Sequence, residues 1–107
     1  MNMRLCSVAC LLALGAVAIT SAGAGAAPNG KELFENTCAM CHPDGGNTIN
    51  EEKTLKGTAL KKNGITGKAD IIKLMRNPGP GMAQFDEATL PQQDAEAIAE
   101  YVLTTFK

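Results

Sequence analysis

The segment that most constrains this chain is Cys38-Ala39-Met40-Cys41-His42. Cys-x-x-Cys-His is the attachment sequence of c-type haem: both thiols add to the haem vinyl groups as thioethers, and the following histidine becomes the proximal iron ligand. The chain has 1 histidine, and it stands directly after the second cysteine. Such a placement arises by chance roughly once in 80 times. The motif therefore predicts one covalently bound haem c per chain.

Two other uses of this cysteine pair remain open. A thioredoxin-type redox disulfide is one, but that motif belongs in a βαβ surround, which this sequence lacks. A zinc site is the other, but two cysteines and one adjacent histidine leave the fourth ligand missing. Both alternatives explain the motif less well than haem does.

Residues 1–26 have the pattern of a secretory signal peptide. Arg4 is followed by a nearly uncharged stretch over residues 5–19, and the segment ends in small residues. We expect cleavage after Ala26, with cleavage after Ala24 as the alternative. The predicted organisation is thus a signal peptide at 1–26 and a monohaem cytochrome c domain at 27–107.

The leader has two alternative fates. An uncleaved anchor is conceivable because the apolar run approaches the roughly 20 residues that a bilayer requires, but the run is rich in Ala and Gly and ends in a cleavage site. Lipid attachment at Cys10 is disfavoured because no apolar stretch precedes it, so Cys6 and Cys10 are interpreted as incidental leader residues.

Cleavage would leave one small domain, because 26 of 107 residues are removed and 81 remain. A domain of this size buries little apolar surface and commonly depends on a cofactor, metal or disulfide. The formal net charge is −1, and loss of Arg4 with the leader makes it −2. Nucleic acid is therefore excluded as an expected partner.

The remaining pattern predicts an all-helical domain. Asn29 can cap a first helix, with Glu32 three residues later, and this helix leads into the haem motif. One face of it carries Gly30, Leu33, Phe34 and Thr37.

Three further helices are expected after a glycine-rich loop that runs from Asp44 to about Lys53. They are a short helix at 54–62, a helix at 70–77 that ends before Pro78, and a last helix with Pro91 in its first turn that reaches about residue 106. The apolar stripe of the last helix is Ile98, Tyr101, Val102 and Thr105. No segment has a strand pattern.

The sixth iron ligand is expected to be a methionine, because no second histidine exists and a soft thioether suits haem iron. Met40 is held between the two cysteines, and Met75 lies in a helical pattern where core packing is the more common role. Met82 lies in an irregular loop, Asn77 to Phe85, whose prolines restrict the backbone and whose glycines allow close approach. We predict Met82 as the distal ligand; in the alternative, it only packs under a turn.

The chain resembles cytochrome c6 and related small class I cytochromes c of bacteria, across essentially the whole of 27–107. The resemblance rests on several ordered motifs: Gly30 to Phe34, Cys38 to His42, Gly45-Gly46-Asn47, Glu52 to Leu55, the methionine loop Asn77 to Phe85, and Ala97 to Val102.

This resemblance implies a small class I cytochrome c fold, with about four short helices wrapped around one covalently bound haem. It implies His42 and Met82 as axial ligands, and a first helix that crosses the last where Gly30 and Phe34 lie near Tyr101. Two positions depart from the photosynthetic members. Ala83 replaces their usual proline, which predicts a looser ligand loop, and Leu74 replaces a common glutamine, which changes the haem environment.

The predicted function is soluble electron carriage in a bacterial periplasm, with redox proteins as partners and a monomeric protein. With both axial positions filled, the iron has no open site for a substrate, so we expect no enzymatic activity. A haem-based sensor with a displaceable methionine is the alternative. We interpret five lysines as a solvated surface, some of which could steer an acidic partner: Lys56, Lys61, Lys62, Lys68 and Lys73.

Overall fold

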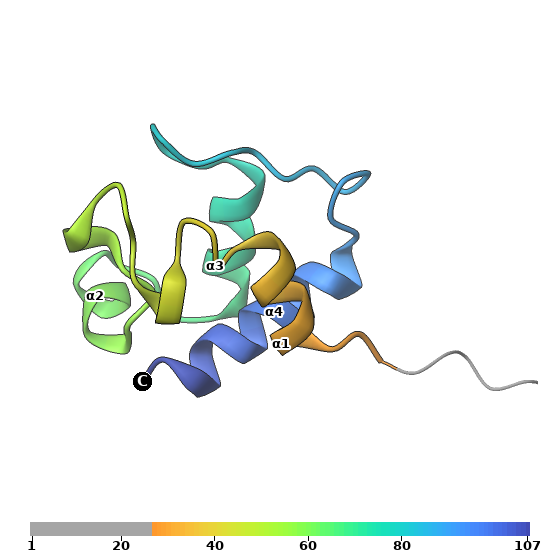
Figure 1. Cartoon of the computed structure of the whole chain (residues 1–107), viewed down its shortest axis with the longest axis horizontal. Helices are drawn as coiled ribbons and strands as arrows, with labels where there is room; N and C mark the ends of the chain where they lie inside the picture. The colour runs from red at the N-terminus through yellow and green to blue at the C-terminus, as the bar shows by residue number, and fades with distance from the viewer. Residues whose placement is uncertain (1–26) are drawn as a thin grey trace, which may run out of the picture.

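The computed structural model describes residues 27–107, which form a small helical domain (Figure 1). The predicted signal peptide and its cleavage sites lie outside the described residues. The elements in chain order are α1 (Gly30–Thr37), η1 (Pro43–Gly45), η2 (Glu51–Lys53), α2 (Gly57–Lys62), α3 (Lys68–Arg76) and α4 (Gln92–Thr105). Within this part of the chain there is no strand, which confirms the all-helical prediction with its four helices.

Helix α1 begins as the sequence predicts. The Asn29 side chain accepts a hydrogen bond from the Glu32 backbone N–H at 3.3 Å. This bond satisfies one of the amide groups that the first turn of a helix leaves without a partner. The helix ends at Thr37, so the haem motif begins at its C-cap, Cys38.

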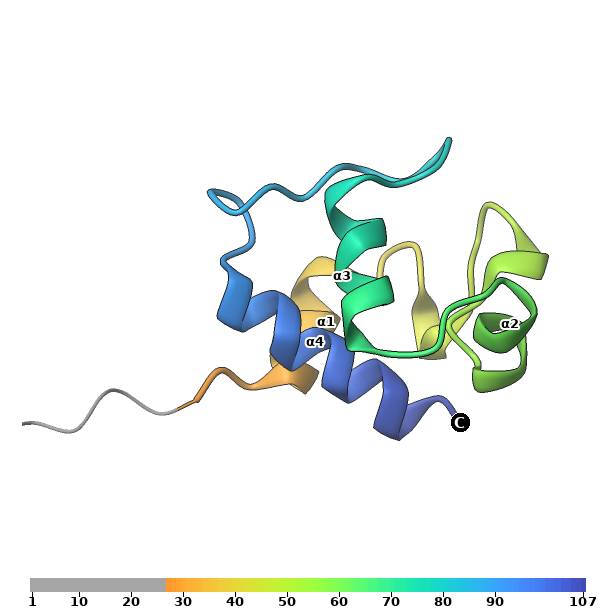
Figure 2. The same ribbon diagram turned by 180° about the vertical axis from the view of Figure 1, so that it is seen from behind.

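Helices α1 and α4 lie against each other, as the two opposite views in Figures 1 and 2 show. Gly30 makes the contact close, because a Cβ on this residue would overlap the backbone carbonyl of Ala97. Three aromatic rings fill the angle beside it: the ring centroid of Phe34 lies 5.3 Å from those of both Tyr101 and Phe106. The predicted crossing is confirmed, and Phe106 is an addition to it.

The core is formed mainly by α4 together with the faces of α1 and α3 that contact it. Its buried members are Phe34, Leu60, Ile71, Met75, Leu90, Ala95, Ile98, Ala99 and Val102. The predicted stripe on α4 is correct for Ile98 and Val102 and wrong for Thr105, which is exposed. The stripe ends at Val102; Ala95 extends it towards the start of α4, and Ala99 adds a buried small residue beside Ile98.

The predicted helix at 54–62 is wrong at its start, since α2 begins at Gly57. The preceding backbone is extended and pairs with distant segments: Leu55 N–H donates to the Gly45 carbonyl at 2.7 Å, and Gly57 N–H donates to the Phe106 carbonyl at 2.7 Å. These bonds hold the loop around the haem motif against the end of α4. A helix that began at residue 54 would use the Gly57 amide for its own first hydrogen bond.

Two other predicted boundaries need correction. Helix α3 spans Lys68–Arg76 rather than 70–77. The Asp70 carboxylate accepts hydrogen bonds from the Thr66 amide at 2.9 Å and hydroxyl at 3.0 Å, which places Asp70 inside the first turn. Pro91 is the N-cap of α4 rather than a residue of its first turn.

Candidate haem site

The haem motif lies on a turn that continues from α1. The His42 amide donates to the Cys38 carbonyl at 2.9 Å, and the Cys41 amide donates to the same oxygen at 3.2 Å. This compact turn brings both cysteines and the histidine to the wall of one cavity. Cys38 is half-buried, whereas Cys41 is exposed.

The cavity has a volume of about 730 Å³ and is bordered by residues of all four α-helices and of the loops between them. Every buried core residue except Ala95 and Ala99 borders it. Ligand cavities are typically about 300–1,000 Å³ and mostly apolar, with few polar groups. The core side chains of this domain therefore surround a space for an apolar group and do not pack only against one another.

The orientation of His42 is set by a backbone contact. Its Nδ1 lies 2.7 Å from the carbonyl oxygen of Gly46, and because a carbonyl can only accept, Nδ1 carries the proton. Nε2 is then left with its lone pair for a metal. The Gly46 carbonyl is a site group that the motif alone does not reveal, although Gly46 stands only four residues after the histidine.

Burial in apolar surroundings raises the pKa of the Cys38 thiol to about 11. The free side chain is therefore neutral over the physiological range. An environment that disfavours a charged sulfur suits a neutral thioether, which is the form that haem attachment would give.

The three methionines of residues 27–107 all border the cavity, but they differ in setting. Met75 is in α3 and is 5% exposed, whereas Met40, between the cysteines, is 90% exposed. Met82 is 38% exposed and lies in the irregular segment after α3. Gly81, just before it, has φ +90°. This left-handed conformation favours glycine and lets the backbone turn at the edge of the cavity.

The methionine loop also approaches the segment that follows the haem motif. A Cβ on Gly81 would lie 3.3 Å from Cγ2 of Ile49, whose side chain borders the cavity. Ile49 and Leu74 are both large exposed apolar residues at this wall. Leu74, which replaces the glutamine common in photosynthetic members, borders the cavity as the sequence predicts. Ile49 was not predicted as a residue of the site.

All five lysines of the predicted surface are exposed. Lys73 and Lys53 border the cavity, whereas Lys68 forms an ion pair with Glu100 at 3.4 Å. Lys56 lies over the ring of Phe106, 5.1 Å from its centroid. The lysines are therefore spread over several surfaces, and only part of the set lies beside the cavity.

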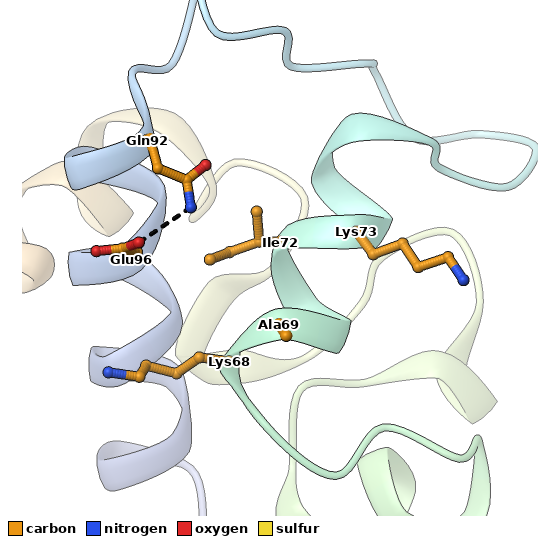
Figure 3. Close-up of a pocket in the computed structure, with 6 residues that line it drawn as sticks. All are labelled: Lys68, Ala69, Ile72, Lys73, Gln92 and Glu96. Carbon is orange, nitrogen blue, oxygen red and sulfur yellow. Dashed lines mark hydrogen bonds between the residues drawn. The ribbon is translucent and has the colours of Figure 1, made fainter.

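A second, shallower hollow lies between α3 and α4 (Figure 3). It is bordered by Lys68, Ala69, Ile72, Lys73, Gln92 and Glu96. Figure 3 shows Ile72 directed towards α4 and Lys73 directed away from it. None of the motif residues or methionines belongs to this hollow, so it is separate from the candidate haem site apart from the shared Lys73.

The residues of the larger cavity fit a covalently bound haem. One apolar space is bordered by two thiols, three thioethers and the imidazole of His42, whose Nε2 keeps its lone pair. The helical fold and this site together define a small c-type cytochrome with one haem.

Comparison with known proteins agrees with that class. Residues 25–102 match the family described as cytochrome c oxidase, cbb3-type, subunit III. Cytochrome c6 of Synechocystis sp. is 38% identical over 96 residues, covering 88% of this chain and 79% of the relative. Cytochrome c6 of Bumilleriopsis filiformis is 40% identical over 76 residues, covering 71% of this chain and 87% of the relative.

Solved structures give the same result. OmcF, an outer-membrane cytochrome of Geobacter sulfurreducens, is 50% identical and superposes with a TM-score of 0.71, over 73% of this chain and 99% of that one. Cytochrome c6C of Synechococcus sp. is 33% identical, with a TM-score of 0.68 over 74% of this chain and 95% of that one. The chain belongs to the cytochrome c6-like family of small monohaem cytochromes, whose members are electron carriers, and it carries one covalently bound haem c.

Proposed function

We propose that this protein carries one electron at a time, with haem attached through Cys38 and Cys41 and with His42 and Met82 as the axial ligands. The observation that supports this is an apolar cavity that all four residues border. The haem, when bound, supplies a one-electron couple of its iron. The chain itself supplies attachment, ligation and exclusion of water.

The side chains divide this work. The Gly46 carbonyl holds the proton on Nδ1 of His42, which fixes the tautomer and makes the ring a stronger donor at Nε2. A thioether from Met82 stabilises ferrous iron and so raises the reduction potential. The apolar residues around the cavity have the same effect, because they disfavour the extra charge of the oxidised form.

Occupation of both axial positions by protein side chains also fits an electron carrier better than an enzyme. A substrate would have no open coordination site. The only histidine of the chain would be bound to iron and could not serve as a general base.

The test replaces Met82 in the holoprotein and compares it with a methionine that should not bind iron. Oxidised wild type should show the weak far-red band of a thioether bound to ferric haem, and Met82→Ala should lack it. The control is Met75→Leu, because this swap conserves volume in the core and usually costs less than about 1.5 kcal/mol. It should keep the band.

Two further measurements follow from the same variants. Reduced Met82→Ala should bind carbon monoxide readily, whereas reduced wild type should resist it near neutral pH. The reduction potential of Met82→Ala should be lower, because water or a nitrogen ligand favours ferric iron more than sulfur does. A wild type that lacks the band and binds carbon monoxide quickly would contradict the proposal and favour the haem-based sensor.

We further propose that residues 1–26 are a cleaved signal peptide and that the protein works in the periplasm. The charge pattern and the small residues before Ala27 support this. Intact mass and N-terminal sequencing of the exported protein should show a start at Ala27, or at Gly25 for the alternative site. A retained leader would instead indicate an anchored protein. Among residues 27–107, no helix combines the length and the apolar character needed to span a bilayer.

The proposed partners are redox proteins, which the carrier meets as a monomer. Lys53 and Lys73 lie beside the cavity and could attract an acidic partner surface to the site of electron transfer. Attraction of this kind weakens as salt increases, so the rate of electron exchange with such a partner should fall with ionic strength.

A further inference from the structure

The loop that carries Met82 has little regular structure of its own. From residue 77 to residue 91 it contains no helix. Met82 N–H donates to the Gly79 carbonyl at 3.4 Å, which is a long hydrogen bond. Besides the approach of Gly81 to Ile49, contacts elsewhere in the loop are therefore needed to keep Met82 at the cavity.

Those contacts converge on Arg76, the last residue of α3. Its Nη1 donates to the carbonyl oxygen of Phe85 at 2.9 Å and to that of Leu90 at 2.8 Å. Its Nη2 donates to the side-chain oxygen of Gln92 at 3.2 Å. Arg76 is half-buried, so these bonds are partly shielded from water.

The backbone around Arg76 makes two more bonds to the same side of the loop. Gln84 Nε2 donates to the Arg76 carbonyl at 2.9 Å, and Phe85 N–H donates to the Met75 carbonyl at 2.8 Å. The loop thus leaves the end of α3 at residue 77 and returns to the same point at residues 84 and 85. Met82 lies in this closed part, two residues before the return.

The far side of this arrangement is anchored on α4. Gln92, the first residue of α4, accepts from Arg76 and donates through Nε2 to Glu96 at 3.0 Å (Figure 3). The guanidinium therefore joins the end of one helix, two carbonyls of the loop and the start of the next helix. A planar guanidinium can bridge several acceptors in fixed directions, whereas a lysine ammonium is a compact point charge without that geometry.

We propose that Arg76 is a positioning residue for Met82: it closes the methionine loop and so keeps the thioether at the iron. This inference rests on the proposed function, because it presumes that Met82 is the ligand. It assigns ligand retention to a residue outside the haem motif and outside the cavity wall.

The experiment compares holoproteins of wild type, Arg76→Gln and Arg76→Lys. The first readout is the rate at which reduced protein binds carbon monoxide. It should rise at least about tenfold in Arg76→Gln, the factor expected when one charge-assisted hydrogen bond is lost. Arg76→Lys should lie between Arg76→Gln and wild type.

The second readout is the far-red sulfur band as temperature rises. In Arg76→Gln the band should disappear well before the helical circular dichroism does, because the loop opens before the domain unfolds. In wild type the two signals should disappear closer together. The reduction potential of Arg76→Gln should be lower, since a weakened thioether contact favours ferrous iron less.

Matched controls separate positioning from general stability. Tyr101→Leu removes a ring contact at the α1–α4 crossing, away from the cavity. It should lower the melting temperature and leave the carbon monoxide rate unchanged. Gln92→Ala removes one of the three guanidinium hydrogen bonds of Arg76, together with the Gln92–Glu96 bond, and should change the rate less than Arg76→Gln.

If Arg76→Gln binds carbon monoxide at the wild-type rate and loses band and helicity together, as Tyr101→Leu does, Arg76 has only a structural role. If Arg76→Gln does not mature, Gln84→Ala and Arg76→Lys still test the closure, and wild-type rates in both would overturn it. A wild type without the sulfur band would overturn the Met82 assignment itself, and this inference with it. The two failures are therefore distinguishable.

Discussion

At the residue scale, much of what holds the loops in this small domain comes from polar side chains bound to nearby backbone. Asp70 accepts from the amide of Thr66, and Asp86 accepts from the amide of Thr89 at 2.8 Å. These hydrogen bonds stabilise the charged carboxylates and lower the pKa of both residues from the ordinary value of 3.8. The Asp70 carboxylate lies in the first turn of α3, and the Asp86 carboxylate stabilises the turn before α4.

The lowered pKa values predict an acid-sensitive contribution to stability. A group with a depressed pKa in the folded state stabilises fully above its unfolded pKa, and this stabilisation is lost as pH falls through the folded pKa. The melting temperature should therefore fall as pH decreases below 3.8. Asp70→Asn and Asp86→Asn should be less stable at neutral pH and should lose less on acidification.

Thermal unfolding followed by circular dichroism from pH 7 to pH 2 measures this. Glu87→Gln, an exposed neighbour of Asp86, is the control and should follow the wild-type curve. Equal acid slopes in wild type and in the double Asp→Asn variant would show that other groups determine the acid transition.

At the element scale, the α1–α4 crossing depends on the absence of a side chain at Gly30. A methyl group there would overlap the Ala97 carbonyl and lie 3.1 Å from Cβ of Tyr101. The two helices would have to move apart, and overpacking of this kind costs about 1–3 kcal/mol. Gly30→Ala should lower the free energy of unfolding by that amount, measured by denaturant titration of the holoprotein.

Gly67→Ala is the matched control for this prediction. Gly67 is the extended N-cap of α3, and a Cβ there has nothing within 4 Å. Replacement by alanine reduces the freedom of the unfolded chain and should be neutral or stabilising by less than about 1 kcal/mol. Equal losses in both variants would contradict the close-crossing explanation.

The elements also show what the sequence could predict. The cap at Asn29, the haem motif and the core stripe through Ile98 and Val102 depend on local spacing, and the structure confirms their places. The closure of the methionine loop by Arg76 and the late start of α2 depend on partners far along the chain, such as Leu90 and Phe106. Local spacing does not reveal such distant partners. At residues 54–56 these tertiary hydrogen bonds outweigh the local preference for a helix.

The candidate site follows the same division. The four predicted site residues border one cavity, and their individual roles in haem attachment and iron ligation remain predictions. The Gly46 carbonyl and Ile49 were missed because each acts through the folded path of the chain. A search for backbone carbonyls within one turn of a ligating histidine could have found Gly46.

At the scale of the whole molecule, the core and the cofactor cavity share almost all their residues. Without haem, the apolar side chains around the cavity would face about 730 Å³ of empty or hydrated space. A domain this small has little other apolar burial to compensate. The double variant Cys38→Ala with Cys41→Ala should therefore be largely unfolded.

Circular dichroism and thermal melting of that double variant measure the dependence on haem. We expect a weak helical signal and no cooperative transition, whereas the holoprotein should melt in one step. Single variants at either cysteine keep one thioether, so their helical signal and melting temperature should lie between those of the holoprotein and the double variant. A cooperative transition with full helicity in the double variant would show that the polypeptide folds without its cofactor.

The contact between Gly30 and Ala97 has a consequence for the order in which the protein assembles. It joins an early segment to one made much later, so the α1–α4 crossing cannot form on a partly synthesised chain, and closing so long a loop is slow. Until the proposed export has brought α4 across the membrane as well, the haem motif, which directly follows α1, has no α4 to pack against. Cys38, half-buried once the domain closes, is then open to the attachment machinery. Maturation would thus precede folding.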